Sequence, residues 1–186
     1  MKPILPNGDR FPPLDPLKAR KGAVLILFYK MEDQWYFPLI QRPLYEGVHS
    51  GQVAFPGGRK EEQDIDLFET AIRESHEEIG TEVSKINVIG SLSDFFVAVS
   101  NHLVKPVVGF YEGVPNFKPD TREVESVIEV PLEQLLDTTF LKEKEIEAAS
   151  GYKLRSPYFE LQNKVVWGAT AMMLSELVDI LNERKQ

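Results

Sequence analysis

The chain has 186 residues, a formal net charge of −8 and no cysteine. Its length suits a single domain, which we expect to span residues 1–186 with a proline-rich N-terminal arm over residues 1–20. The acidic balance argues against a nucleic acid as the main partner, because a phosphate backbone needs a basic surface. The absence of cysteine excludes disulfides, thiolate catalysis and cysteine-ligated zinc.

The sequence shows no signal for membrane insertion or secretion. The longest apolar run, residues 23–29, is too short to span a bilayer, and the N-terminal arm lacks the apolar core of a signal peptide. We therefore expect a cytoplasmic protein without a membrane partner. Lys18, Arg20 and Lys21 form a small basic cluster, which we interpret as a solvated surface, with contact to an anionic ligand as the alternative.

The first part of the chain predicts two paired strands and a long connection. Residues 23–29 are a β-rich apolar run typical of a buried strand. After a turn, residues 35–41 predict a second strand, antiparallel to the first. Residues 42–55 form a long connection for a compact domain, and such connections are often functional.

A glycine loop at Gly57-Gly58 leads into a helix predicted over residues 67–79. Asp66 suits the N-cap, with Glu69 three residues later in the capping-box relation. Gly80 suits a left-handed C-terminal cap.

The spacing of side chains gives this helix two different faces. The apolar spacing predicts a buried stripe made of Phe68, Ala71, Ile72, Ser75 and Ile79. The opposite, polar face is predicted to carry Thr70, Arg73, Glu74, Glu77 and Glu78.

Further strands are predicted after this helix. Residues 82–90, 91–96 and 124–130 alternate enough for strands. Residues 103–111 form another apolar strand, which Pro106 interrupts, and this favours a sheet edge or a bulge.

The last part of the chain predicts two helices and a hairpin. Residues 131–136 suit a short helix with proline in its first turn, and residues 142–147 are a charged run that we interpret as solvated surface. Residues 158–166 predict a hairpin, and residues 167–183 an amphipathic helix. We expect an α/β/α sandwich with a mixed sheet between the helices 67–79 and 167–183.

The polar face of helix 67–79 suggests a site for a hard cation. Glu74 and Glu78 are i, i+4 neighbours and Glu77 lies one turn from Glu74, so that three carboxylates share one face. A divalent cation would relieve their repulsion, and oxygen ligands without cysteine favour Mg²⁺ or Mn²⁺ over zinc. The alternative is a solvated acidic surface.

The glycines on both sides of the helix add a family resemblance. Gly57-Gly58, Arg73-Glu74-x-x-Glu77-Glu78 and Gly80 together resemble the Nudix box. The loop before Arg73 is one residue longer than in the general box, and its acidic residue is Asp64. This variant resembles the coenzyme A pyrophosphatase branch, and the resemblance covers about residues 21–181.

Two other segments are similar to the same branch. The run from His49 to Gly58 resembles the signature that precedes the box, and Trp167 to Ala171 resembles the start of the last helix. Arg42 stands at the first arginine of the signature, whereas Gly47 replaces its second arginine. This loss weakens the assignment of coenzyme A as substrate, but not the resemblance to a pyrophosphatase.

The resemblance implies a hydrolase that uses water to cleave a P–O–P bond. Glu74, Glu77 and Glu78 would bind Mg²⁺ or Mn²⁺. Arg73 would orient a neighbouring glutamate, form an ordinary ion pair with Glu77, or do both. The general base would be Glu77 or Glu123, and the alternative for Glu123 is a solvated loop residue.

Five residues before the helix are candidates for substrate contact. Gly57 and Gly58 would let the backbone approach metal or phosphate, with a tight turn as the alternative. Arg42 would clamp phosphate, with a surface ion pair as the alternative. His49 and Gln52 would touch substrate, with turn stabilisation as the alternative.

The branch resemblance implies coenzyme A or an acyl derivative as the small-molecule substrate, split into 3′,5′-ADP and a 4′-phosphopantetheine product. The alternatives are another nucleoside diphosphate derivative, such as ADP-ribose, a dinucleotide or an oxidised nucleotide. A non-catalytic nucleotide sensor would have lost acidic residues of the box, and this chain retains them. A homodimer is expected from general frequency alone.

Overall fold

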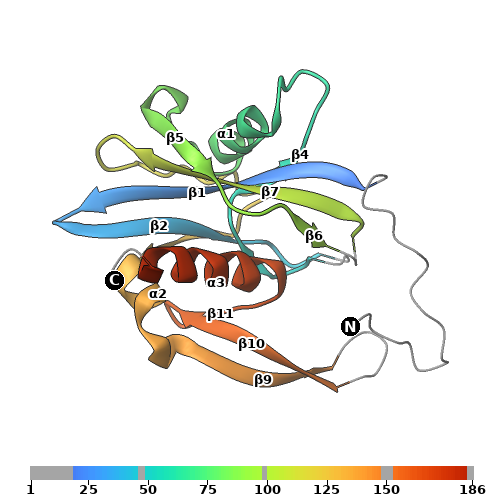
Figure 1. The fold of residues 1–186 in the computed structure, drawn as a ribbon. Helices are drawn as coiled ribbons and strands as arrows, with labels where there is room; N and C mark the ends of the chain where they lie inside the picture. Colours follow the sequence, from blue (N-terminus) through green and yellow to red (C-terminus); the bar gives the residue numbers. More distant parts are fainter. Residues whose placement is uncertain (1–18, 46–48, 98–99, 148–152, 184–186) are drawn as a thin grey trace.

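Strand β1 (Arg20–Met31) is central to the main sheet in a computed structural model that describes residues 19–45, 49–97, 100–147 and 153–183 (Figure 1). It pairs in parallel with β7 (His102–Tyr111) along one side. Along the other side it pairs antiparallel with β4 (Gly57–Arg59) and then with β2 (Gln34–Gln41). The predicted antiparallel pairing of the first two long strands is confirmed.

In the described part of the chain, the main sheet has eight strands. Its principal order is β3-β2-β1-β7-β5, while β4, β6 and β8 pair with β1, β7 and β2 respectively. The remaining strands are β3 (Val53–Ala54), β5 (Ile86–Ser91), β6 (Phe95–Val97) and β8 (Ser126–Pro131).

Helices α1 (Leu67–Ile79) and α3 (Gly168–Glu183) cover opposite faces of this sheet (Figure 1). Alternation along β1 supplies both cores, because successive side chains point to opposite faces. Ala71 of α1 packs in one cluster with Leu25, and Leu174 of α3 packs in another cluster with Ile26. The predicted mixed sheet between two helices is confirmed.

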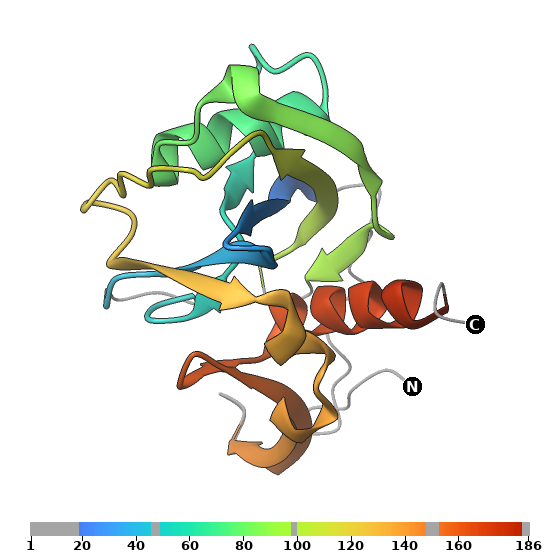
Figure 2. The same cartoon turned by 90° about the vertical axis from the view of Figure 1, so that its left-hand side faces the viewer.

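A smaller sheet lies on the far side of α3 from the main sheet, as both views show (Figures 1 and 2). It consists of β9 (Leu141–Glu147), β10 (Lys153–Leu161) and β11 (Lys164–Val166) in antiparallel pairing. Residues 142–147 are therefore a paired strand, and not merely a charged surface run. The partner strand β10 supplies the backbone hydrogen bonds that the charge pattern does not reveal.

Short helices connect the larger elements. The segment η2 (Val83–Lys85) precedes β5, so that the strand predicted over residues 82–90 begins later than expected. Helix α2 (Leu132–Leu136) begins after Pro131, as predicted, and is followed by η3 (Thr138–Phe140).

Pro106 lies within an interior strand, and the prediction of a sheet edge is wrong. Strand β7 pairs with β1 on one side and with β5 and β6 on the other. Leu92 follows β5, and its N–H donates to the Pro106 carbonyl at 2.9 Å. Since N–H and C=O of one strand residue point to the same side, the missing proline N–H faces the break between β5 and β6.

Helix α1 begins and ends at the predicted residues. The Asp66 carboxylate accepts hydrogen bonds from the N–H groups of Phe68 and Glu69 at 2.8 and 2.9 Å. The Glu69 carboxylate in turn accepts from Ile65 N–H at 2.6 Å, which secures the first turn. Gly80 closes the helix in the left-handed conformation, with φ of 71°.

The two faces of α1 differ from the sequence-based prediction. Thr70 and Glu78, expected on the polar face, are buried, whereas Phe68 and Ile72 of the expected apolar stripe are only partly buried. The reason is that two segments cover part of the polar face. Gly57 and Gly58 form strand β4 against β1 instead of the expected loop, and the Gly57 N–H contacts Glu78. The loop before α1 brings Asp64 to Thr70.

The end of α1 provides a test of this packing. Gly80→Ala should lower the free energy of unfolding by about 2 kcal/mol, because φ is positive and the new methyl group would crowd the Lys118 backbone. Gly113 also has positive φ, but an added Cβ meets nothing within 4 Å, so Gly113→Ala should cost only about 1 kcal/mol. Urea unfolding measures both. Equal losses would show that the contact with Lys118 carries no cost.

Candidate active site

A buried ion pair between Asp64 and Arg73 fixes the loop in front of α1. Arg73 donates from Nε to Oδ1 at 2.8 Å and from Nη2 to Oδ2 at 3.0 Å. Asp64 is only 3% exposed and also accepts hydrogen bonds from Thr70 Oγ1 and the Glu61 N–H. The Arg73 guanidinium holds the pKa of Asp64 far below its ordinary value. The acidic residue of the longer loop is therefore the charged partner of Arg73.

Arg73 also holds two glutamates and the backbone of β4. Its Nη1 lies 3.0 Å from Glu74 Oε1 and 2.9 Å from Glu77 Oε2. Its Nη2 donates to the Arg59 carbonyl at 3.0 Å. One guanidinium thus orients neighbouring carboxylates and forms the i, i+4 pair at the same time.

Glu78 is a buried carboxylate attached to β4. It is 1% exposed, and it accepts a hydrogen bond from the Gly57 N–H at 2.7 Å. Arg42 Nη2 lies 3.5 Å from its other oxygen. The pKa of Glu78 is raised to about 7, mainly by burial and also by the charges of Glu74 and Glu123. Arg42 and the Gly57 N–H act in the opposite direction.

Glu74 lies against Gly58, and this contact explains why residue 58 is glycine. A Cβ at residue 58 would overlap the Glu74 carboxylate, and a Cβ at residue 57 would overlap the backbone of β1. Burial raises the pKa of Glu74 in spite of the nearby Arg73, and the charges of Glu77 and Glu123 add to this rise. The two glycines therefore bring the strand backbone directly to the carboxylates.

Glu123 comes close to the box glutamates through the return of the chain along α1. The Lys118 N–H donates to the Ile79 carbonyl and the Asp120 N–H to the Glu78 carbonyl, both at 2.9 Å. Glu123 is exposed, and its charge contributes to the raised pKa of Glu74 and Glu78. The other candidate base, Glu77, has a side chain that is 54% exposed and pairs with Arg73. Glu77 and Glu123 therefore both lie at the edge of the same group of carboxylates.

The candidate substrate residues fall into two groups. Arg42 lies inside the site, where Nη2 donates to the Gly57 carbonyl at 3.3 Å. His49 and Gln52 lie in the turn before β3, and His49 Nδ1 is 3.0 Å from Gln52 Oε1. The Arg42 N–H donates to the Gln52 carbonyl at 3.0 Å and joins this turn to the end of β2.

The donor set fits a hard divalent cation, although no preformed ligand cluster of three acidic or histidine side chains occurs among the described residues. Arg73, Arg42 and the Gly57 N–H engage the carboxylate oxygens. Burial raises the pKa of Glu74 and Glu78, and the charges of the neighbouring glutamates add to this rise, so that the cluster carries more negative charge than these partners neutralise. Oxygen ligands with this excess charge suit Mg²⁺ or Mn²⁺.

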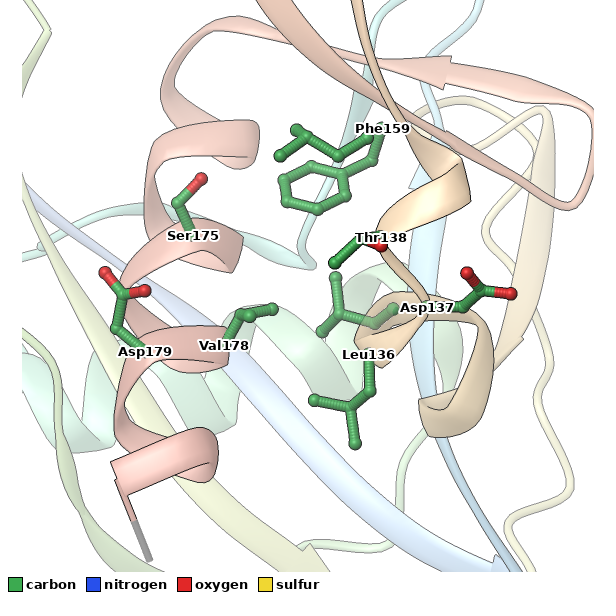
Figure 3. Close-up of a pocket in the computed structure, with 9 residues that line it drawn as sticks. Leu136, Asp137, Thr138, Phe159, Ser175, Val178 and Asp179 are labelled. Carbon is green, nitrogen blue, oxygen red and sulfur yellow. The ribbon is translucent and has the colours of Figure 1, made fainter. Parts of the chain in front are cut away.

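A separate cavity of about 100 Å³ lies away from these carboxylates (Figure 3). It is formed where α2, η3, β10 and α3 meet, on the face of the main sheet opposite α1 (Figure 1). Its lining is mostly apolar, with Leu135, Phe159 and Val178 among the contributing residues. The site residues predicted from the sequence therefore lie at the carboxylate cluster and not in this cavity.

The backbone of Arg59 adjoins the site, because its carbonyl accepts a hydrogen bond from Arg73, and the Arg59 side chain contacts His102. The sequence motifs did not single out either residue. Arg59 Nε donates to His102 Nε2 at 3.1 Å. The two residues belong to β4 and β7, which both pair with β1. Their proximity depends on sheet pairing, and no local sequence pattern indicates it.

Comparison with known proteins agrees with this architecture. Residues 19–150 match the NUDIX domain family. Nudix hydrolase 15, mitochondrial, and Nudix hydrolase 22, chloroplastic, both from Arabidopsis thaliana, are 34% and 33% identical over 98% and 90% of this chain. The aligned regions cover 64% and 57% of those two proteins, so this chain spans less than two thirds of their length. The Nudix hydrolase NudL of Pectobacterium atrosepticum is 34% identical over 93% of this chain and 89% of its own.

Solved structures show the same fold at low sequence identity. The Nudix hydrolase RenU from M. smegmatis is 14% identical, with a TM-score of 0.58 over 98% of this chain and 96% of its own. The NUDIX domain of Shewanella oneidensis NrtR, complexed with ADP ribose, is 16% identical, with a TM-score of 0.57 over 90% of this chain and 89% of its own. Together with the family match and the curated relatives, these findings establish that the chain belongs to the Nudix family of hydrolases.

Proposed function

We propose that this Nudix hydrolase is a Mg²⁺-dependent pyrophosphatase that splits coenzyme A or acyl-CoA into 3′,5′-ADP and a 4′-phosphopantetheine product. The observation that supports a metal-dependent pyrophosphatase is the grouping of Glu74, Glu77 and Glu78 around Arg73 and the backbone of β4. The coenzyme A part of the proposal rests on the segment from His49 to Gly58 and its resemblance to the coenzyme A branch.

The three box glutamates would hold the metal ion, and Mn²⁺ is the alternative to Mg²⁺. Nudix hydrolases generally use divalent metal ions. A bound ion of this kind supplies positive charge at the diphosphate oxygens and lowers the pKa of a bound water. Gly57 and Arg73 support the ligand set, because they position Glu78 and Glu74 before any ion arrives.

The general base is one of two glutamates at the edge of the site. Glu123 is exposed, and its charge raises the pKa of Glu74 and Glu78. Glu77 is tied to Arg73 by an ion pair of 2.9 Å, which favours a role in holding metal over proton transfer. We therefore propose Glu123 as the group that accepts the proton of the attacking water, with Glu77 as the alternative.

Substrate phosphate is proposed to bind Arg42 in this reaction. Its contacts with Glu78 and the Gly57 carbonyl are long, at 3.5 and 3.3 Å, so a phosphate could replace them at little cost. His49 and Gln52 stay predicted substrate contacts.

Another nucleoside diphosphate derivative is the alternative substrate class. Gly47 stands where the coenzyme A signature has its second arginine, and this keeps ADP-ribose, a dinucleotide or an oxidised nucleotide as possible substrates. A non-catalytic nucleotide sensor is disfavoured, because all three box glutamates are present.

Assembly and location stay predictions. No helix in the described ranges has both the length and the apolar character needed to cross a bilayer. The homodimer and the cytoplasmic location rest on the sequence-based expectations alone.

The substrate proposal is tested by product analysis. Purified protein with Mg²⁺ is incubated separately with coenzyme A, ADP-ribose and a dinucleotide, and the products are separated by chromatography. Release of 3′,5′-ADP selectively from coenzyme A is expected. Cleavage of the other compounds alone would contradict the coenzyme A assignment, and cleavage of none would contradict the pyrophosphatase assignment.

The metal-binding role is tested with Glu78→Gln. Turnover should fall about a hundredfold or more, because the neutral amide cannot replace a buried anionic ligand, while 3′,5′-ADP still binds. Glu62→Gln removes the same charge from an exposed residue in the loop before α1 and should leave turnover unchanged. Unchanged turnover of Glu78→Gln would exclude this glutamate as a metal ligand.

The positioning of Arg73 is tested through Asp64. Asp64→Asn should cost about 3 kcal/mol of unfolding free energy, because it leaves a buried guanidinium without its anionic partner. Asp94→Asn, which breaks an exposed pair with Lys105, should cost less than about 1 kcal/mol.

The same ion pair gives a pH dependence with a definite sign. Because the folded-state pKa of Asp64 is lowered, its stabilising effect is present above the unfolded pKa of about 3.9 and is lost as pH falls below that value. Urea midpoints measured from pH 6 to pH 3 should therefore decline less steeply for Asp64→Asn than for the unaltered protein. Parallel profiles would contradict the proposed electrostatic contribution.

A further inference from the structure

We propose that Arg59, Arg20 and His102 form an anion site that binds a phosphate group of the substrate outside the hydrolysed diphosphate. The inference rests on the proposed function, in which coenzyme A carries such a group as its ribose 3′-phosphate. Arg59 and Arg20 are the binding cations, and His102 positions Arg59.

Strand pairing brings these three residues to one end of the main sheet. Arg59 of β4 pairs with Gly22 of β1. Two residues earlier in β1, Arg20 pairs with His102 of β7. Paired residues, and residues two apart in one strand, lie on the same face of a sheet. The side chains of Arg59, Arg20 and His102 are therefore on one face.

Arg59 reaches His102 across β1. Strands β4 and β7 lie on opposite sides of β1, and Arg59 Nε donates to His102 Nε2 at 3.1 Å. The residue of β1 that pairs with Arg59 is Gly22, so no side chain blocks the crossing. This bond fixes the guanidinium and leaves its other N–H groups for a ligand.

The bond also requires a neutral histidine ring, because only an unprotonated Nε2 can accept a hydrogen bond. Burial and the nearby charges of Arg59, Arg20 and His49 lower the pKa of His102, against the effect of a hydrogen bond with the Ser100 backbone. His102 therefore orients Arg59 without cancelling its charge.

The two arginines also lack acidic partners within the described ranges. There, neither Arg59 nor Arg20 lies within ion-pair distance of a carboxylate, whereas Arg42, Arg73 and Arg122 each do. In a chain with a net charge of −8, these two arginines form a local region of positive charge. Guanidinium groups suit phosphate oxygens, so a phosphate dianion is the ligand that this arrangement favours.

The anion site adjoins the carboxylate cluster through β4. Gly58 faces Glu74, and Arg59 is the next residue of the strand, so its side chain points to the opposite face of the sheet. The Arg59 carbonyl accepts a hydrogen bond from Arg73 at 3.0 Å. A substrate with its diphosphate at the glutamates would therefore pass around β4 to bring a neighbouring phosphate to Arg59.

Binding measurements test the anion site without relying on turnover. Calorimetry compares 3′,5′-ADP with 5′-AMP, which lacks the additional phosphate. The unaltered protein should bind 3′,5′-ADP at least about tenfold more tightly, and Arg59→Gln should lose most of that difference. Lys85→Gln removes the same charge from a lysine in η2 whose side chain is 42% exposed, and it should retain the full difference.

Kinetics with coenzyme A and 3′-dephospho-coenzyme A test the same site in the reaction. Arg59→Gln should lower the ratio of the two kcat/KM values about tenfold, mainly through KM for coenzyme A. Arg59→Lys should restore part of the ratio, and His102→Ala should reduce it through KM with little change in kcat.

The outcomes separate the two proposals. If neither coenzyme A compound is cleaved but 3′,5′-ADP binds through Arg59, the proposed function fails and the anion site stands. If the unaltered protein binds both nucleotides equally, or if Arg59→Gln leaves the affinity ratio unchanged, the anion site is wrong. Circular dichroism of each variant confirms that it is folded, and Arg59→Lys replaces Arg59→Gln if the latter does not fold.

Discussion

The buried pair of Asp64 and Arg73 is the interaction on which the rest of the site depends. Removing both charges from water is costly, and the cost is offset only by close geometry and additional hydrogen bonds. Here, Arg73 meets Asp64, two glutamates and the Arg59 carbonyl, while Asp64 meets two further donors. The pair therefore fixes the loop, the helix and β4 relative to one another. Its main consequence is that Arg73 holds Glu74 and Glu77 in place, although these carboxylates repel each other.

The close approach of β4 to α1 gives these carboxylates their chemistry. Gly57 donates its N–H to Glu78, and Gly58 leaves the space that Glu74 fills. The same approach buries both glutamates, so that their pKa values rise. The need of these glutamates for a positively charged partner thus follows from the packing of the glycines of β4 on the acidic helix α1. Arg42, which follows β2, supplies part of this positive charge to Glu78. Its distance of 3.5 Å from the carboxylate is long enough for another anion to replace the contact.

Local signals predicted the helix but not the surroundings that make it functional. Asp66 and Gly80 delimit α1 by hydrogen bonds within a few residues, so its limits could be read from the sequence. Burial of Glu78 depends on β4, and the position of Glu123 depends on backbone bonds from residues 118 and 120 to the end of α1. Such contacts join distant segments, and periodicity carries no information about them. The interior position of Pro106 was missed for the same reason, because it requires a break between two partner strands.

Strand β4 links two kinds of chemistry through the alternation of its side chains. Gly58 faces α1 and the Glu74 carboxylate, and the Arg59 side chain lies on the opposite face with His102. In the proposed function, a substrate that passes around this strand would meet the box glutamates with its diphosphate and the arginines with another phosphate. Because different residues would serve the two contacts, selection of the substrate could change without loss of the proposed metal ligands. Arg73 contacts both parts of this arrangement: one nitrogen pairs with Glu74, and another donates a hydrogen bond to the Arg59 carbonyl.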